Sequence, residues 1–227
     1  MEKRYDNIIM KRFYYFNLYV IKGKKGDILI DTGFICMKKR VKKWLDQFNI
    51  KLIILTHVHV DHSWNTNYIK ELYNCKVAIG IQDKKNLDNS KINSIAKNKL
   101  LNRWTKLMNW GMRKFIPEEY KIDYYLRNNE TINKYGLKLK IISLKGHTTG
   151  SIGIKYKDYI FVGDALVNRG PKVSIAYQNQ HPENAVKSVN KILKEKPRII
   201  FVGHDKEITN SKLYKSFQSI DKDTLLS

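Results

Sequence analysis

The residues best suited to chemistry lie in one short stretch of the chain, from His57 to His62. Three of the six histidines are here, as His57, His59 and His62, and Asp61 stands just before the last of them. Imidazole nitrogens and carboxylate oxygens at this density are typical ligands of zinc, and also of manganese, iron or cobalt. We therefore expect a metal site rather than a chance group of polar loop residues.

The apolar run at residues 52–55 indicates how these ligands are held. Its composition predicts a buried strand, so the histidines follow the carboxyl end of that strand, where α/β sheets carry their ligands. In extended backbone His57 and His59 point to the same side and can hold one cation between them. Asp61 and His62 come after a bend and can face a second cation.

Three later motifs place further ligand candidates at the ends of predicted strands. Gly-His-Thr-Thr-Gly-Ser contains His147, Gly-Asp-Ala contains Asp164, and Gly-His-Asp contains His204. Five of the six histidines therefore follow strands. The sixth, His181, precedes Pro182 at the start of a predicted helix, and we expect it on the surface or as a helix cap.

Other residues with reactive side chains receive different interpretations. Asp31, in an Asp-Thr-Gly turn after a strand, is either a turn former or the residue that orients a metal-binding histidine. Asp205 is expected to accept hydrogen bonds in a loop rather than to bind metal. Cys36 and Cys75 lie far apart without zinc-ribbon spacing, so we expect buried or inert thiols.

The elements that position the ligands alternate between strand and helix in the first half of the chain, which is typical of an α/β fold. We expect a hairpin over 13–31, helices over 37–48 and 64–73 with the second beginning near Ser63, and a strand over 76–81. The second half is rich in short strands, expected over 130–135, 137–144, 151–156, 159–162 and 198–202, with a helix over 182–195 before the last.

A helical insertion over about 84–128 interrupts this alternation. Apolar residues recur at helical spacing from Ile92 to Phe115 with basic residues between them. The segment is interpreted as a packed helix, an active-site lid, a dimer surface or a membrane-surface helix. We expect it to lie over the metal centre, with Trp104, Met108 and Met112 lining an apolar pocket.

The length and charge of the chain limit the classes of protein to consider. Its 227 residues favour one domain spanning 1–227. The net charge of +22 is spread along the whole chain, so it is weak evidence for a nucleic-acid partner, and we expect a small-molecule substrate. No signal peptide or membrane-spanning run is evident, which makes the cytoplasm the expected location.

The chain contains five motifs in this order: Asp-Thr-Gly, His-x-His-x-Asp-His, Gly-His-Thr-x-Gly-Ser, Gly-Asp-Ala and Gly-His-Asp. This ordered set resembles the motifs of the metallo-β-lactamase-fold hydrolase superfamily. The resemblance covers about residues 28–205. It implies a four-layer αβ/βα sandwich with two divalent metal ions between the sheets, zinc being expected and iron or manganese the alternatives. By position in these motifs, the resemblance assigns the first metal to His57, His59 and His147, the second to Asp61, His62 and His204, and the bridging role to Asp164.

Details of the motifs narrow the branch of the superfamily. The true lactamases lack an aspartate equivalent to Asp164, diiron flavoproteins have an acidic residue in place of His59, and persulfide dioxygenases keep fewer of these ligands. The pattern is most similar to the glyoxalase-II-like and lactonase-like hydrolases. After His204 the chain leaves little room for the helical substrate domain of glyoxalase II. The complete ligand set argues against a binding module without activity.

The resemblance implies hydrolysis by a water that two cations acidify and that attacks a carbonyl carbon. Asp61 is the candidate catalytic residue, because its carboxylate would lie beside this water and could relay a proton. The expected substrate is a carbonyl ester, a thioester or a lactone. A phosphodiesterase or nuclease is the alternative, since a bimetal centre also cleaves phosphodiesters and the chain is basic.

Overall fold

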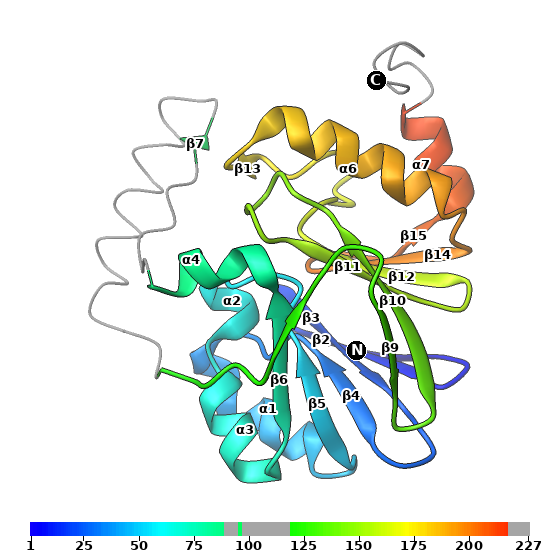
Figure 1. The fold of residues 1–227 in the computed structure, drawn as a ribbon. Coiled ribbons are helices and arrows are strands. Elements are labelled where there is room, and N and C mark those ends of the chain that lie inside the picture. The colour runs from blue at the N-terminus through cyan, green and yellow to red at the C-terminus, as the bar shows by residue number, and fades with distance from the viewer. Residues whose placement is uncertain (89–94, 97–118, 218–227) are drawn as a thin grey trace.

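The structure is a computed structural model that describes residues 1–88, 95–96 and 119–217. Two mixed β-sheets pack face to face, and helices cover the outer face of each sheet (Figure 1). This four-layer arrangement confirms the predicted αβ/βα sandwich.

The first sheet has seven strands in the order β1-β2-β3-β4-β5-β6-β8. Neighbours from β1 to β4 are antiparallel, and β4, β5, β6 and β8 are parallel. The strands are β1 (Glu2–Tyr5), β2 (Ile8–Phe13), β3 (Phe16–Ile21), β4 (Asp27–Ile30), β5 (Ile50–Ile54), β6 (Lys76–Gly80) and β8 (Tyr124–Leu126). The helical segments between them are η1 (Ile35–Met37), α1 (Lys38–Leu45), α2 (Val60–Ser63), α3 (Thr66–Tyr73), η2 (Ile81–Asp83) and α4 (Lys84–Asp88).

The second sheet has six strands in the order β15-β14-β12-β11-β10-β9. They are β9 (Thr131–Lys134), β10 (Leu137–Ser143), β11 (Ile152–Tyr156), β12 (Tyr159–Gly163), β14 (Ile199–Val202) and β15 (Ile208–Thr209). Helices α6 (Pro182–Lys194) and α7 (Asn210–Phe217) cover its outer face. A separate antiparallel pair joins β7 (Ile95–Ala96) to β13 (Gln178–Asn179).

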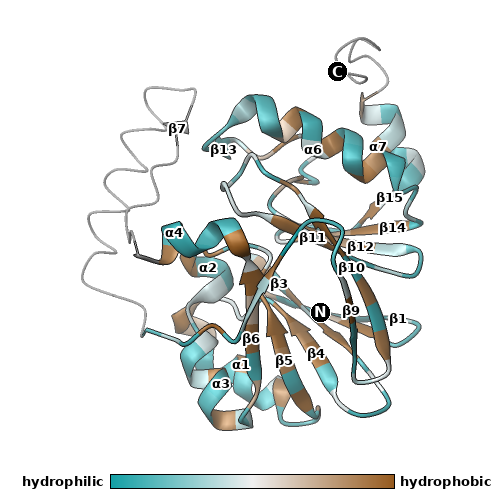
Figure 2. Cartoon of the chain, viewed as in Figure 1, coloured by the Kyte–Doolittle hydropathy of each residue, from teal (hydrophilic) through white to brown (hydrophobic). Residues whose placement is uncertain are grey.

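The alternation of side chains along each strand divides the core into layers. In β4, Ile28 and Ile30 face the second sheet, whereas Leu29 packs toward α1. Because both faces are covered, all four residues of β4 are buried, as is typical of parallel strands in such folds. The central strands β4, β5 and β6 are accordingly apolar, and the outer surfaces of the helices are largely polar (Figure 2). Trp44 of α1 is 5% exposed, which confirms that it belongs to the core.

The structure differs from the sequence-based expectation at the amino-terminal hairpin. The expected strand at 13–21 is divided by a turn at Tyr14 and Tyr15, and Tyr14 has a φ of 48°. Residues before this turn form β1 and β2, which the charged composition of the segment had concealed. β1 is at the edge of the sheet, where a strand needs only one buried face, so its apolar signal is diluted.

The helix after the metal-binding motif also starts earlier than expected. Its first turn is α2, which begins at Val60 rather than near Ser63. Asp61 and His62 therefore lie on helical backbone, and His59 occupies the N-cap position in extended conformation. The motif has no helical apolar periodicity because its side chains serve as ligand candidates, which is why the sequence did not reveal this turn.

The predicted insertion at 84–128 is described only in part. It begins with α4 as expected, but Tyr124–Leu126 at its end is strand β8, paired in parallel with β6. A three-residue edge strand is too short to show periodicity in a sequence. Apart from the backbone of β7, the segment Ile92–Phe115 lies outside the described residues, as do Trp104, Met108 and Met112, so its position over the metal centre stays a prediction.

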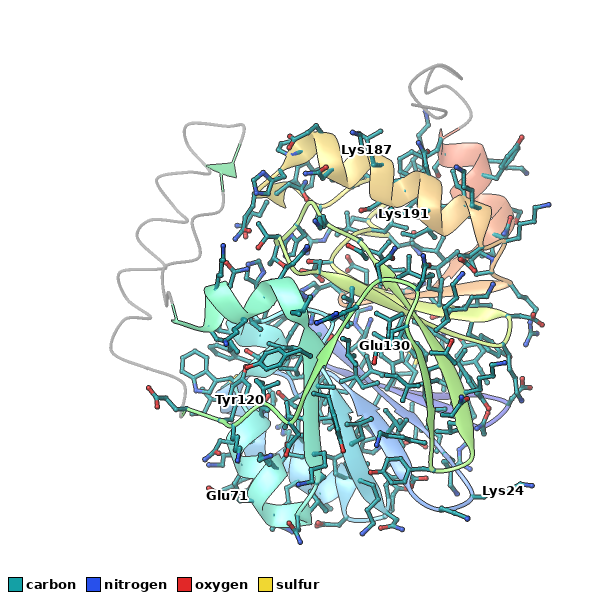
Figure 3. The ribbon with its side chains drawn as sticks, in the orientation of Figure 1. Lys24, Glu71, Tyr120, Glu130, Lys187 and Lys191 are labelled. Carbon is teal, nitrogen blue, oxygen red and sulfur yellow. The ribbon has the colours of Figure 1, made fainter. Side chains whose placement is uncertain are left out.

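Positive charge is distributed over distant parts of the fold. Lys24 lies at the turn between β3 and β4, whereas Lys187 and Lys191 lie on α6 at the opposite end of the molecule (Figure 3). No helix in the described part of the chain is long and apolar enough to cross a membrane.

Candidate metal centre

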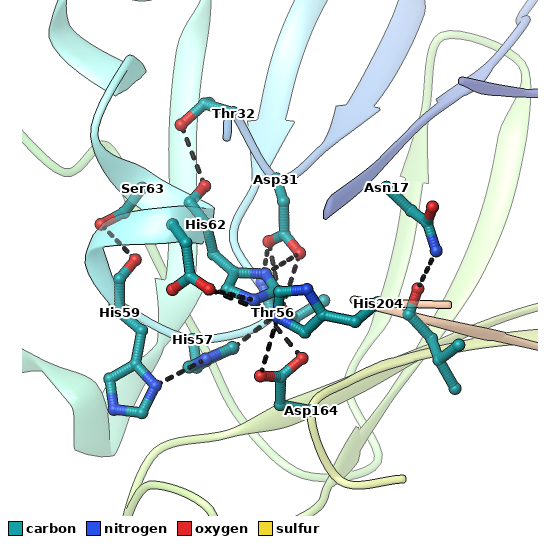
Figure 4. A network of polar contacts seen from close by, with 12 residues as sticks. Asn17, Asp31, Thr32, Thr56, His57, His59, His62, Ser63, Asp164 and His204 are labelled. Atoms are coloured by element: carbon teal, nitrogen blue, oxygen red, sulfur yellow. Dashed lines mark hydrogen bonds and ion pairs between the residues drawn. The ribbon is translucent and has the colours of Figure 1, made fainter. Parts of the chain in front are cut away.

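The seven candidate ligands lie together where strands of both sheets end. His57, His59, Asp61 and His62 follow β5, and the other three follow strands of the second sheet. Figure 4 labels five of the seven: His57, His59, His62, Asp164 and His204. Their ligand atoms form three groups, each with its members within 4.8 Å of one another. The groups are His57, His59 and His147; His57, His62 and Asp164; and Asp61, His62 and His204.

The first cluster consists of three buried imidazoles, His57, His59 and His147. The Nδ1 atom of His59 lies 3.0 Å from Nε2 of His57 and 2.8 Å from Nε2 of His147. Nδ1 of His147 donates to the carbonyl oxygen of Gln178. Because a neutral imidazole has only one N–H, Nε2 of His147 must then present a lone pair to the cluster.

His57 is held in the same tautomer by a longer chain of contacts. The hydroxyl of Thr56 donates to the carboxylate of Asp31, so it is free to accept from Nδ1 of His57 at 3.1 Å. Nε2 of His57 therefore also presents a lone pair toward His59. Lone pairs that converge at this distance repel one another unless a cation or a proton lies between them, so the donor set fits a divalent metal.

The second cluster combines one carboxylate with two imidazoles. Nε2 of His204 lies 3.3 Å from Oδ2 of Asp61, and Nε2 of His62 lies 3.9 Å from the same atom. The outer nitrogens are again occupied: Nδ1 of His204 donates to the carbonyl oxygen of Tyr15 at 2.7 Å, and Nδ1 of His62 contacts Asp31 at 2.8 Å. Both Nε2 atoms therefore point inward as potential ligands.

Asp164 lies between the two clusters and reaches both. One oxygen is 3.4 Å from His62, and the other is 3.6 Å from His147 and 3.2 Å from His204. These two facing atoms, Oδ1 of Asp164 and Nε2 of His62, are buried and make an ion-pair contact but no hydrogen bond. Buried polar atoms rarely lack a hydrogen bond, so both are suited to an additional group at the centre. A bridging carboxylate is what a pair of divalent cations requires.

The ordered motifs and this geometry agree with a comparison against known families. A sequence profile of the Metallo-beta-lactamase superfamily matches residues 15–204. The chain belongs to this superfamily.

Curated relatives within the superfamily include enzymes. A probable metallo-hydrolase of Methanocaldococcus jannaschii is 33% identical over 157 residues, which cover 68% of this chain and 68% of that protein. Hydroxyacylglutathione hydrolase 1 of Vibrio vulnificus is 27% identical over 199 residues, covering 86% of this chain but 64% of that protein.

Solved structures of the superfamily share the fold at low sequence identity. A metallo-beta-lactamase family protein of Thermus thermophilus superimposes with a TM-score of 0.71 and 18% identity, covering 96% of this chain and 79% of that chain. A protein solved in a di-iron-bound form gives a TM-score of 0.67 at 20% identity, covering 88% and 93% of the two chains. The superfamily match, the 33% identity to a probable metallo-hydrolase and the histidine-rich centre together show that this chain is a metallo-hydrolase of the superfamily.

The two clusters differ in their electrostatics. Burial lowers the pKa of His57 and His147, and lowers that of His59 to about 3. In the second cluster burial has the same tendency, but the carboxylates of Asp164 and Asp61 outweigh it and raise the pKa of His204 to about 10. Without a cation, the first cluster is neutral near pH 7 and the second carries protons on its imidazoles.

Asp31 was left open by the sequence, and the structure shows that it orients other groups. Its carboxylate accepts from the backbone N–H of Thr56 at 2.8 Å and contacts His62. It also has a φ of 61°, so it forms the turn as well. Asp31 therefore forms the turn and also holds a candidate ligand, His62, whose binding of a metal stays a prediction.

Asp83 was missed by the sequence analysis although it joins the two loops of the first cluster. It is fully buried and accepts from the backbone N–H of Val58 at 3.1 Å, on the loop after β5. It also accepts from Thr148 at 2.9 Å and from the backbone N–H of Gly150 at 2.9 Å, on the loop after β10. Its position three residues after the end of a buried strand was the one available signal.

The remaining reactive residues lie outside the clusters. Asp205 accepts from Arg169 at 3.0 Å, which confirms its interpretation as a loop acceptor. His181 is at the N-cap position of α6 and is partly exposed, again as expected. Cys75 is buried, and burial raises the pKa of its thiol to about 11. Cys36 is exposed on η1, so it is not a buried thiol, and its expected inertness stays a prediction.

Proposed function

We propose that this protein is a hydrolase of carbonyl esters, thioesters or lactones that uses two divalent cations and acts on a small molecule in the cytoplasm. Zinc is the proposed metal, and iron and manganese are the alternatives. A structural relative solved with two irons supports iron as an alternative. The observation that carries the proposal is the position of Asp164 between two clusters of inward-facing imidazoles.

The proposed ligand roles follow the grouping of the side chains. His57, His59 and His147 would hold one cation, and Asp61, His62 and His204 the other. Asp164 would contact both cations. Two bound cations would supply a water of lowered pKa and polarise a carbonyl oxygen of the substrate.

Asp61 is the proposed catalytic residue because it is the most exposed of the ligand candidates. Its side chain is 27% exposed, against 12% for Asp164. Although burial opposes ionisation, the neighbouring imidazoles lower the pKa of Asp61 to about 2, so it is a carboxylate at neutral pH. It can accept the proton of the attacking water, whose oxygen bonds to the acyl carbon, and relay it to the leaving alkoxide or thiolate as the C–O or C–S bond breaks.

The similarity to a hydroxyacylglutathione hydrolase supports an acyl substrate. The basic charge of +22 favours a second candidate function, phosphodiester hydrolysis, because phosphate esters are attracted to positive surfaces. The two functions differ in the atom attacked, carbon or phosphorus, and can be separated by substrate.

A substrate panel tests the proposal. The purified protein, loaded with a stated metal and analysed for metal content, is assayed on thioesters, lactones, carboxylic esters and bis-ester phosphates. We expect higher kcat/KM on the carbonyl substrates, and a loss of kcat of about 100-fold or more in Asp61→Asn. His181→Asn is the matched control, because it changes an exposed histidine outside the clusters. A phosphodiester cleaved much faster than every carbonyl substrate would refute the assignment.

A further inference from the structure

A groove on the outer side of the first sheet gathers basic side chains from two elements. It lies between α1 and strands β1 and β2 and has a volume of about 450 Å³, within the usual range of small-molecule sites. Its basic lining residues, which define what we call the basic groove, are Lys11, Arg12, Arg40 and Lys43.

The positive charge of the basic groove is largely unbalanced. Among the described residues that line it, Glu2 is the one acidic side chain and is already engaged: the indole N–H of Trp44 donates to it at 2.9 Å, and Arg4 lies 3.5 Å away. Within residues 1–88, 95–96 and 119–217, three of the four basic residues form no ion pair: Lys11, Arg40 and Lys43. Unpaired like charges on adjacent elements attract an anion that carries several charges.

One wall of the basic groove is an exposed aromatic ring. Tyr14 lies at the tip of the β2–β3 hairpin and is 82% exposed. A large aromatic side chain held out on a tight turn offers a face on which a planar base can stack. A phosphate-binding surface next to such a ring is suited to a nucleotide.

The same hairpin connects the basic groove to the metal centre. Tyr15, next to the groove residue Tyr14, accepts from His204 and stacks on its imidazole with ring centroids 6.0 Å apart. Arg12 of the groove lies 3.5 Å from the carboxylate of Asp205, which follows His204. A ligand in the groove is therefore adjacent to the loop that carries a proposed metal ligand.

We propose that the basic groove binds the phosphate-bearing nucleotide portion of an acyl thioester substrate, whose thioester end extends past Tyr14 to the metal centre. This inference rests on the proposed function, which it narrows to thioesters of a nucleotide-linked thiol. The groove volume suits a single nucleotide rather than a long polymer, and an acidic peptide would make no use of an exposed aromatic face.

Binding to the metal-free protein tests the groove without any turnover. The probe is adenosine 3′,5′-bisphosphate, titrated by calorimetry in the presence of a chelator so that the metal centre cannot hold its phosphates. We expect Arg40→Glu/Lys43→Glu to weaken binding roughly tenfold or more, as expected when charge-assisted contacts are reversed. Tyr14→Ala should weaken the nucleotide but leave the affinity for inorganic pyrophosphate unchanged.

The matched control is Lys24→Glu/Lys187→Glu, which makes the same change in net charge on exposed residues away from the groove (Figure 3). Thermal unfolding verifies that each variant is folded. Equal losses in the groove and control variants would show that only overall charge matters and would overturn the inference. Preference for a single-stranded oligonucleotide over the mononucleotide would overturn it in favour of nucleic acid.

Kinetics distinguish failure of the groove from failure of the proposed function. An acyl coenzyme A is compared with the same acyl group on N-acetylcysteamine, which lacks the nucleotide. We expect the groove variant to raise KM roughly tenfold for the coenzyme A thioester alone, with kcat unchanged. Equal kcat/KM for both thioesters in the unaltered protein would refute nucleotide binding in the basic groove. The proposed hydrolase function would not be affected by that result. Cleavage of neither thioester would refute the thioester substrate itself, even if the bisphosphate binds.

Discussion

His204 and His62 each face carboxylates across a buried centre, and these charges set the pH range in which the second cluster can bind a cation. Despite burial, which acts in the opposite direction, Asp164 and Asp61 raise the pKa of both imidazoles, that of His204 to about 10. At pH 7 an arriving cation must therefore displace protons from this cluster. The first cluster has no such protons, because burial lowers the pKa of its imidazoles.

We predict that affinity for the second cation rises with pH between 6 and 8, while affinity for the first changes little. The raised pKa of His204 leaves protons on the second cluster, which compete with metal below about pH 10. The lowered pKa of His59 leaves the first cluster deprotonated between pH 6 and 8. Chelator-competition titrations at several pH values, with metal counted by elemental analysis, measure both affinities.

His204→Ala provides the control for this prediction. It should bind one cation per chain instead of two and should lose the steep pH dependence. An unaltered stoichiometry in this variant, or equal pH slopes for the two sites in the unaltered protein, would contradict the assignment of the second cluster.

Among the elements, the loops after β5 and β10 belong to different sheets and yet supply the three histidines of one cluster. Asp83, at the end of η2, joins them through Val58 on one loop and through Thr148 and Gly150 on the other. Burial raises the pKa of Asp83, and the hydrogen bonds it receives act in the opposite direction. The loops therefore share one buried acceptor that limits their separation.

We predict that Asp83→Asn weakens binding of the first cation by about 10- to 100-fold, the usual effect of removing a group that positions metal ligands. The amide has one acceptor oxygen in place of two, so it cannot serve both loops. Asp27→Asn is the matched control, because Asp27 is also buried and accepts from two backbone N–H groups, those of Gly23 and Asn49, outside the metal clusters. Each variant should lose about 1–3 kcal/mol of unfolding free energy, but equal metal affinity in the two would refute the positioning role of Asp83.

For the molecule as a whole, the metal centre is a contact between its two halves. His57, His59, Asp61 and His62 come from loops of the first sheet, whereas His147, Asp164 and His204 come from loops of the second. In the absence of cations, the carboxylates and protonated imidazoles of the second cluster provide part of this contact. Bound cations would add ligand bonds across the same interface.

We predict that chelation lowers the melting temperature. At free metal 100 times above Kd, each site contributes about 2.7 kcal/mol, and a chain of this length shifts by about 2–4 °C per kcal/mol. Calorimetry with and without chelator measures the shift. His204→Ala should show a smaller shift than the unaltered protein, and His181→Asn an equal one. A melting temperature insensitive to metal would contradict the binding of cations between the two sheets.

The sequence by itself determined the ligand candidates, their order and the α/β class, and the resemblance of its motifs implied the four-layer sandwich. Buried strands are short apolar runs that leave a local signal, and polar residues directly after such runs must lie at one edge of a sheet. His57, His147, Asp164 and His204 could be read in this way without knowing which strands are neighbours. The amphipathic patterns of α1 and α6 are local signals of the same kind.

Only the tertiary structure decided how these residues are held, because that depends on contacts between segments far apart in the sequence. Asp83 has its role only because the loops after β5 and β10 meet in the folded chain. Its hydrogen-bond partner Thr148, for example, is 65 residues away in the sequence. The orientation of the His204 ring is set by the carbonyl oxygen of Tyr15, 189 residues away. Edge strands β1 and β8, and the helical start at Val60, carry too little periodicity to be detected locally; their structure comes from the neighbours against which they pack.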